Sequence, residues 1–271
     1  MVFERTHKAA RITVYEDAFN KRIRIDDYSG NITEVIQLIA QTVPAWTEKI
    51  IVKSRPQDVS AFMKKGYCEE AHVKGYFAGI DMHFVTRYPS RQRQYNKKEP
   101  EEEAIIDGVL GTPTAGSSAL SFPITYASSA DAHELAKLYR DTFPVYPTPL
   151  GDPEYILKTM TDGTLYVYIK ERNKIVAAAS AEINKQYRNA ELTDCATAEG
   201  FQGKGYMRSL LLELERNLRT QGITCLYTIA RAESFGMNKA FHDLGFAYTG
   251  RMTNNCFIFS GLEDMNVWYK F

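Results

Sequence analysis

The chain has 271 residues, of which 44% are hydrophobic, so it can bury one large core or two modest ones and is too apolar for a disordered protein. Lysine plus arginine equals aspartate plus glutamate at 33 each, which gives no electrostatic reason to expect nucleic acid or a membrane as partner. The sequence shows no membrane-length apolar run, no signal-peptide core and no Cys-x-x-Cys pair. We therefore expect a cytoplasmic protein with reduced thiols and no metal site.

The first ninety residues are predicted to form a small unit of strands and helices. Apolar alternation and helical periodicity place its elements at 11–26 (two strands around a turn), 31–42 (helix), 50–52 (strand), 57–65 (helix), 67–73 and 80–87 (strands). Gly66 follows the second helix at the position where a glycine commonly ends one. Residues 1–90 are therefore expected to be a separate domain.

Residues 91–121 change character and predict the domain boundary. A basic stretch is followed by acidic residues and then by a segment rich in Gly, Pro, Thr and Ser. The apolar residues within 105–110 are expected to form a short helix that docks on a domain.

The second domain is predicted to cover residues 122–271. Its elements are expected at 124 (strand), 129–140 and from 152 (helices), 164–170, 174–182 and 188–197 (strands), 207–218 (helix), 223–230 (strand), from 234 (helix), 246–258 and 265–270 (strands). A proline-stiffened loop at 142–149 joins the first two helices.

A glycine-containing turn lies between a predicted strand and a predicted helix. It comprises Gln202, Gly203, Lys204, Gly205, Tyr206 and Met207. Glycines let the backbone turn tightly and direct several N–H groups to one point, and the following helix adds its positive N-terminal end. This arrangement favours a phosphate-bearing ligand. Its spacing differs from that of a P-loop and of a dinucleotide-binding fingerprint.

The same residues carry a resemblance to a known superfamily. The motif Gln202-x-x-Gly205-x-Met207 is similar to the acetyl-CoA loop of the GCN5-related N-acetyltransferases (GNAT), and Leu244-Gly245-Phe246 is similar to their next motif. Peptides at 193–197, 227–232, 236–238, 253–255 and 263–270 resemble the β-lysine N-acetyltransferases, which work beside lysine 2,3-aminomutase. The resemblance implies acetylation of the ε-amino group of β-lysine, acetyl-CoA as co-substrate, and a product that serves as a compatible solute.

The resemblance also implies the fold. We expect an α/β (α+β) protein in which a central mixed, mostly antiparallel, twisted sheet is flanked by helices. The order strand, helix, Lys65-Gly66-Tyr67, hairpin echoes the order around Leu244-Gly245-Phe246, so residues 1–90 are expected to be a partial GNAT-like copy. Because this copy lacks the loop motif, packing or dimerisation is its favoured role, and the alternative is one wall of the acceptor site. A homodimer is therefore an open expectation.

The resemblance assigns the cofactor-binding residues. The strand end at Cys195, Ala196 and Thr197 is expected to pair with the pantetheine arm, and the backbone of Gln202 to Met207 is expected to hold the pyrophosphate. Met207 departs from the usual Gly or Ala but keeps its backbone donor. Ser234 and Asn238 start the helix that flanks the arm, although helix capping is the favoured alternative for Ser234.

Deprotonating the acceptor amine requires a base, because an alkyl ammonium titrates near about 10. Asp194 and Glu191 lie on the entering strand, and their spacing of three predicts opposite faces. We choose Asp194 as base or ammonium anchor, with a simple ion-pairing carboxylate as the alternative, and assign Glu191 to the substrate. The tyrosine that usually protonates the thiolate is replaced by Phe241, so the acid stays open among Tyr227, Tyr248 and water, since His242 points away.

The other acceptor contacts come from later residues. Arg231 is a candidate for the substrate carboxylate. Asn254, Asn255 and Asp264 lie in the final hairpin, and each is equally compatible with a turn. Two further functions remain open from sequence: acetylation of a polyamine, diamino acid or protein amine, and non-catalytic binding of acyl-CoA.

Overall fold

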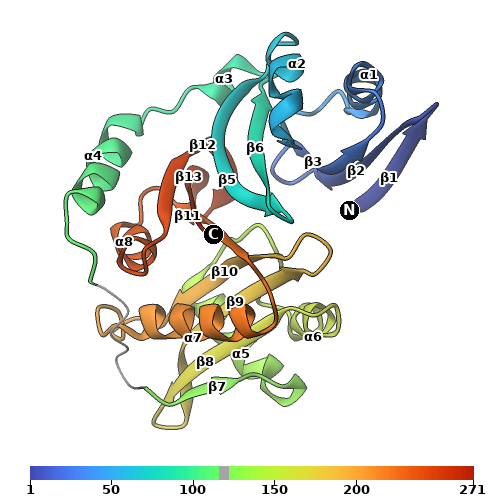
Figure 1. The fold of residues 1–271 in the computed structure, drawn as a ribbon. Helices are drawn as coiled ribbons and strands as arrows, with labels where there is room; N and C mark the ends of the chain where they lie inside the picture. Colours follow the sequence, from blue (N-terminus) through green and yellow to red (C-terminus); the bar gives the residue numbers. More distant parts are fainter. Residues whose placement is uncertain (116–121) are drawn as a thin grey trace.

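The computed structural model describes residues 1–115 and 122–271. It contains two mostly antiparallel β-sheets, one from each half of the chain, with helices packed against them (Figure 1). This confirms the mixed α/β class that the sequence predicts. No helix within the described residues is long and apolar enough to cross a membrane.

The N-terminal sheet has six strands in the order β1-β2-β3-β4-β6-β5. Its elements are β1 Val2–His7, β2 Ala10–Asp17, β3 Arg22–Ser29, α1 Ile32–Thr42, β4 Lys49–Ser54, α2 Val59–Met63, β5 Cys68–Phe77 and β6 Ile80–Arg87. The side chain of Asn31 caps α1 by accepting from the Thr33 N–H, and Val35 and Ile39 of α1 are buried in the core of this half. The sequence analysis missed β1 because its residues are mostly exposed and show no apolar alternation.

The C-terminal sheet has seven strands in the order β12-β13-β11-β10-β9-β8-β7. Its elements are β7 Ile124–Tyr126, α5 Ala132–Thr142, α6 Pro153–Thr161, β8 Leu165–Glu171, β9 Lys174–Asn184, β10 Asn189–Thr197, α7 Tyr206–Thr220, β11 Cys225–Arg231, α8 Phe235–Asp243, β12 Ala247–Ile258 and β13 Gly261–Lys270. Two helices, α3 Arg91–Gln94 and α4 Glu99–Leu110, run along one side of the molecule from the first sheet toward the second (Figure 1).

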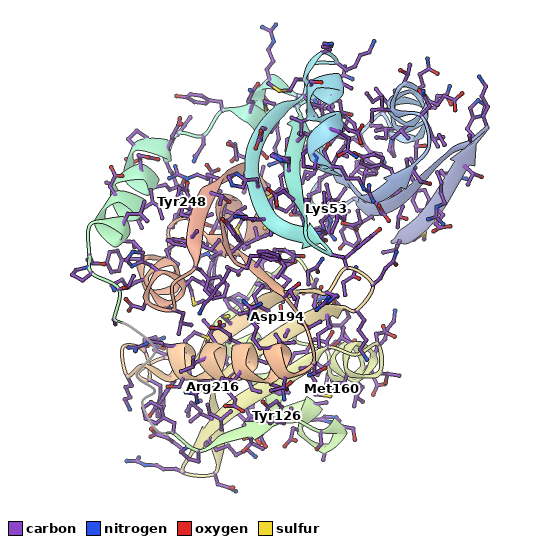
Figure 2. The ribbon with its side chains drawn as sticks, in the orientation of Figure 1. Lys53, Tyr126, Met160, Asp194, Arg216 and Tyr248 are labelled. Carbon is purple, nitrogen blue, oxygen red and sulfur yellow. The ribbon has the colours of Figure 1, made fainter. Side chains whose placement is uncertain are left out.

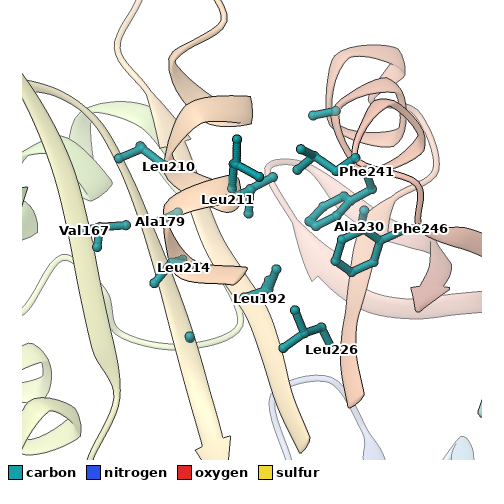
Figure 3. Close-up of a cluster of buried hydrophobic side chains, with 14 of the residues drawn as sticks. Val167, Ala179, Leu192, Leu210, Leu211, Leu214, Leu226, Ala230, Phe241 and Phe246 are labelled. Atoms are coloured by element: carbon teal, nitrogen blue, oxygen red, sulfur yellow. The ribbon is translucent and has the colours of Figure 1, made fainter. Parts of the chain in front are cut away.

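Helix α7 covers one face of the C-terminal sheet. Its leucines Leu210, Leu211 and Leu214 are fully buried and belong to one core with Val167 and Leu192 of the sheet (Figure 3). Burying each leucine stabilises the fold by about 1.5 to 3 kcal/mol. This packing fixes the N-terminus of α7, and therefore the glycine loop before it, relative to the end of β10.

The two halves repeat one connectivity. Strands β2-β3-β4-β6-β5 and β9-β10-β11-β13-β12 have the same order, and β3–β4 and β10–β11 are the parallel pair in each sheet. This agrees with the expected echo between the halves. Only Gly30 and Asn31 separate β3 from α1, so the first half has no loop equivalent to the one that precedes α7.

The halves pack together through β5 and β12. At Gly250 the backbone of β12 approaches β5 so closely that a Cβ would lie 2.1 Å from the Glu70 carbonyl oxygen. Apolar residues of both sheets, including Phe84 and Val267, form one buried core across this contact. Beside it, the fully buried Lys49 pairs with Glu70 at 3.1 Å. The two sheets are therefore held as one unit.

Helix α4 also contributes to the core of the second half. Ile106 and Val109 are buried in the same core as α7 and α8. The short docking helix that the sequence predicted is therefore present, and it is longer than expected. Residues 116–121 of the predicted linker lie outside the described residues.

Candidate active site

The site lies where two parallel strands separate. Strand β10 pairs with β11 only over residues 189–191, although the strands continue to Thr197 and Arg231. A cavity of about 770 Å³ lies there, lined by both strand ends, residues 201–208, the start of α8 and the loop residues Phe143 and Tyr146. The unpaired edge of β10 leaves backbone groups available to an extended ligand.

The glycine loop forms one end of this cavity. Gly203 and Gly205 have φ of 76° and 83°, values that favour glycine. Gly205 is the N-cap of α7 and offers no capping side chain, so the positive end of this helix lies at this end of the cavity. The Gln202 side chain accepts from the Gly200 N–H and donates to the Thr197 carbonyl, which ties the loop to β10. This geometry suits a phosphate or pyrophosphate group.

Asp194 lies at a bulge in β10, on the wall of the cavity. The register between β9 and β10 shifts between Thr193 and Ala196, and Asp194 has a left-handed φ of 50°. Ser180 Oγ donates to Asp194 Oδ2 at 2.7 Å, and the Tyr146 hydroxyl donates to Oδ1 at 3.4 Å. The backbone strain and both hydrogen bonds fix the direction of this carboxyl group.

Burial makes Asp194 a stronger base than an ordinary aspartate. Burial raises the pKa of Asp194 to about 6, with a smaller rise from the charge of Glu191, while the hydrogen bonds from Ser180 and Tyr146 oppose the shift. A carboxyl with this pKa is mostly ionised at neutral pH and accepts a proton more readily than one near 4. This is the property that a general base for an amine requires.

The bulge corrects the expectation that Glu191 and Asp194 face opposite sides of the sheet. In the register, Glu182 is paired with Glu191 and Ser180 with Thr193, so these four side chains share one face. Asp194 reaches Ser180 on that face because the extra bulge residue breaks the alternation. Both carboxylates therefore lie on the same face of β10.

Most of the predicted cofactor-binding residues line the cavity. They are Cys195, Thr197, all six residues from Gln202 to Met207, and Ser234, which also caps α8 by accepting from the Met237 N–H. Ala196 does not line it and is buried in the core under α5. Burial also raises the pKa of the Cys195 thiol, so this cysteine is no nucleophile.

Asn238 has a structural position instead of the predicted ligand contact. Its side-chain nitrogen donates to the carbonyls of Arg231 and Ser234, and its oxygen accepts from Asn266 and Trp268. Because these four hydrogen bonds use its donors and acceptor, the residue joins α8 to β11 and β13.

The predicted substrate residues of the last hairpin lie away from the cavity. Asn254 donates to the backbone carbonyls of Arg93 and Tyr95 near α3, and Asp264 accepts from the Asn254 N–H at 2.6 Å. The Asn255 carbonyl accepts from Arg93 and from an arginine of β3. These contacts join the hairpin to the first half of the chain, at the point where the register of β12 shifts between Met252 and Cys256.

Arg231 does line the cavity, but its guanidinium is already paired. Its Nε and Nη2 donate to the two carboxylate oxygens of Glu263 at 2.5 and 2.9 Å. A bidentate pair of this kind satisfies the charge that a substrate carboxylate would need.

The suggested proton donors lie outside the cavity. Tyr227 donates to Glu191 at 2.8 Å, Tyr248 packs on Trp268, and the imidazole of His242 also lies beside that indole. Tyr146 is the cavity phenol nearest the base, and sequence reasoning did not single it out. Its place in the proline-stiffened loop was the available signal, but no periodicity in a loop shows where a side chain points.

Known proteins are similar to this chain over most of its length. The acetyltransferase (GNAT) family matches residues 132–246. The N-acetyltransferase YodP of Bacillus subtilis is 37% identical over 94% of this chain and 94% of its own. Two proteins named Beta-lysine N(6)-acetyltransferase are also similar: that of Methanosarcina mazei is 37% identical over 90% of this chain and 99% of its own, and that of Methanococcus maripaludis is 33% identical over 93% of each. The chain thus belongs to the GNAT family and is an acetyltransferase.

Proposed function

We propose that this protein transfers the acetyl group of acetyl-CoA to the ε-amino group of β-lysine (3,6-diaminohexanoate), giving N6-acetyl-β-lysine and CoA. The observation that carries the substrate is the similarity, over nearly the full length, to two enzymes named for this reaction. The chemistry of the cavity is compatible with it, since a glycine loop for phosphate and a raised-pKa carboxyl share one space.

The residues of the cavity have distinct roles in this proposal. The backbone of Gln202 to Met207 holds the pyrophosphate, and the edge of β10 at Cys195 and Thr197 holds the pantetheine arm. Acetyl-CoA supplies the thioester. Asp194 accepts a proton from the substrate ammonium, and the freed amine forms the C–N bond as the C–S bond breaks. The Tyr146 phenol donates the proton that the departing sulfur takes and regains one from the nitrogen of the new amide, and burial supports this by keeping the phenol protonated between turnovers.

We further propose a domain assignment for the chain. Residues 122–271 form the catalytic GNAT domain, residues 91–121 connect it to the first domain, and residues 1–90 form a degenerate GNAT-like domain. The four free cysteines support a cytoplasmic location, where thiols stay reduced.

The test is a thiol-release assay with acetyl-CoA against β-lysine, α-lysine, spermidine and a lysine-containing peptide, with mass analysis of the product. Turnover of β-lysine with acetylation at the ε-nitrogen is the expected result. Preferred turnover of another amine would reject the substrate and keep the fold and chemistry.

Replacing Gly203 by valine is expected to raise the Kd of acetyl-CoA about 10-fold or more. The loss follows from a β-branched residue at φ of 76° and from a side chain added to the loop wall. Gly222→Val is the matched control, because its φ is 78°, it also has open space at its Cβ, and it lies beyond the other end of α7, outside the cavity lining. Isothermal titration of both variants measures the effect, and an equal loss in the two would contradict the assigned loop contact.

Replacing Tyr146 by phenylalanine is expected to lower kcat by about 10- to 100-fold with little change in the Kd of acetyl-CoA. The phenylalanine keeps the stacked ring contact with Phe143 and removes only the hydroxyl. It also removes a hydrogen bond to Asp194, so the acidic limb of the pH profile should move to higher pH. An unchanged kcat would rule out Tyr146 as the proton donor.

A further inference from the structure

Charged side chains from both sheets gather beside the active site. We define the interdomain cluster as Arg24, Asp26 and Lys53 of the N-terminal sheet together with Glu182 and Glu191 of the C-terminal sheet. Figure 2 labels Lys53 in the upper sheet and Asp194 in the lower one. Within the first group, Arg24 Nε lies 2.6 Å from Asp26 Oδ1, and Lys53 Nζ lies 3.0 Å from the same oxygen.

Within the cluster, positive charge is in excess on the N-terminal sheet and negative charge is in excess on the C-terminal sheet. Arg24 forms a bidentate pair with Asp26, as Arg231 does with Glu263, but Lys53 pairs with the same Asp26 carboxylate, so the N-terminal group keeps one positive charge in excess. Glu182 and Glu191 are directly opposite each other on adjacent strands, and neither has a cation within ion-pair distance among the residues that the structure describes. Like charges in this position destabilise a sheet unless something compensates them.

Aromatic side chains connect the two groups into one unit. Lys53 Nζ donates to the Tyr76 hydroxyl at 2.9 Å, and the Tyr76 ring packs against Tyr227 with centroids 5.3 Å apart. Tyr227 in turn donates to Glu191 Oε2 at 2.8 Å. The positive and negative groups are therefore held at a fixed separation across the domain interface.

The electrostatics show that these groups influence one another. Burial alone would lower the pKa of Arg24, but Asp26 and also Glu191 raise it. The surrounding protein and the charge of Glu191 raise the pKa of Glu182, and Arg24 and Lys53 only partly oppose this. Charges that interact this strongly lie in a region from which much of the bulk water is excluded.

The cluster lies in line with the proposed base. Glu182 and Glu191 form one cross-strand pair, and Ser180 and Thr193 form the next pair on the same face, where Ser180 holds Asp194. Two residues along a strand correspond to roughly 7 Å. This is comparable with the distance between the two amines of an extended β-lysine.

The charged groups remain accessible to a ligand. The side chains of Arg24 and Asp26 are 28% and 23% exposed, and Glu182 is also exposed to solvent. The exposed Glu182 and the partly buried Glu191, beside the partly buried cation of Arg24, are complementary to a zwitterion, which presents an ammonium and a carboxylate together.

We propose that Arg24 binds the carboxylate of the acceptor amino acid and that Glu182 and Glu191 bind its β-ammonium, so that the distal amine lies at Asp194. This inference rests on the proposed function. It gives the N-terminal domain the role of a specificity determinant, which was the alternative to packing or dimerisation. It also explains why a free diamino acid would require both domains.

Two analogues of β-lysine isolate the two contacts. 6-Aminohexanoate lacks the β-amine and keeps the carboxylate, whereas 1,4-diaminopentane keeps both amines and lacks the carboxylate. Arg24→Met is expected to lower kcat/KM for β-lysine about 10- to 100-fold and to leave that for 1,4-diaminopentane within about 3-fold. Glu182→Gln is expected to lower kcat/KM for β-lysine about 10-fold and to leave that for 6-aminohexanoate within about 3-fold.

The ratio of the kcat/KM values for two substrates, measured on one variant, does not depend on how much of that variant is folded. Arg11→Met, at an exposed arginine of the same sheet, is the control and should change neither ratio. Equal losses on β-lysine and its analogue in the Arg24 or Glu182 variant would overturn the inference. The proposed function fails separately, if the wild-type enzyme does not acetylate β-lysine at all.

Discussion

Replacing Asp194 by asparagine is expected to lower kcat about 10²- to 10⁴-fold, the range that a positioned general base contributes. Asparagine keeps the size of the side chain and an oxygen for the Ser180 hydroxyl, but it cannot accept a proton. In the wild type, kcat/KM should fall as the pH drops through about 6, because protonated Asp194 is no base. In the variant, this fall of kcat/KM through about pH 6 should be absent. The rise of kcat/KM with pH that follows deprotonation of the substrate amine should remain.

The same substitution is expected to stabilise the fold at neutral pH. The pKa of Asp194 in the folded protein, about 6, lies above its ordinary value of 3.8, so the favourable contribution of the protonated group is lost as the pH rises through 6. Asparagine avoids the buried charge and should raise the free energy of unfolding by about 2 to 3 kcal/mol at pH 7.5, with no gain near pH 4. Urea unfolding at the two pH values measures this.

The control removes an exposed carboxylate just beyond the same strand. Glu199→Gln should keep full activity and change stability by less than about 0.5 kcal/mol at either pH. If Asp194→Asn retained more than about a tenth of the wild-type kcat, the assigned base would be wrong, and a water-relayed proton path would replace it.

Replacing Gly250 by alanine is expected to destabilise the protein by about 3 to 5 kcal/mol. The added Cβ would lie 2.1 Å from the Glu70 carbonyl oxygen and 3.0 Å from the Ala71 Cα, and both are backbone atoms that cannot rotate away. Strands β5 and β12 would have to move apart. Because the two halves of the interdomain cluster are brought together by the packing of the two sheets, KM for β-lysine should rise more than the Kd of acetyl-CoA.

Gly163→Ala separates the clash from backbone strain. Gly163 has φ of 102° and no atom within 4 Å of its Cβ, so this variant carries the cost of a positive φ alone, about 1 to 2 kcal/mol. Denaturant unfolding of both variants at one pH provides the comparison. Equal destabilisation in the two would mean that the approach of β12 to β5 contributes little to holding the domains together.

Local signals in the sequence were enough to place most helices and strands. Asn31 caps α1 and Asp152 caps α6, and the sequence predicted that helices begin at these two positions. Gly205 directly precedes α7, as the loop motif requires. These features depend on interactions within a few residues, so a local sequence pattern is enough to predict them. The strand β1 was missed because its side chains bury little apolar surface.

The glycine loop between β10 and α7 was also predictable, because its residues are contiguous and its turn depends on local backbone conformation. The acceptor residues were not. Counting along β10 put Glu191 and Asp194 on opposite faces, and a single bulge residue placed them on the same one. Likewise, Asn254 and Asp264 were expected at the acceptor, but Asn254 lies at a register shift in β12 and donates to the Arg93 carbonyl of α3, with Asp264 beside it. Bulges are decided by packing against other strands, which a single strand pattern does not contain.

What the sequence by itself determined is the order of most elements, the glycine loop before α7 and the family, since each follows from short-range patterns. Only the tertiary structure decided that Ser180 and Tyr146 hold Asp194, and that Arg24 and Lys53 of the first domain lie near Glu182 and Glu191 of the second. These groups come from segments far apart in the chain. Their proximity depends on how the two repeated sheets pack, and that packing rests on one close backbone approach at Gly250 and a shared apolar core.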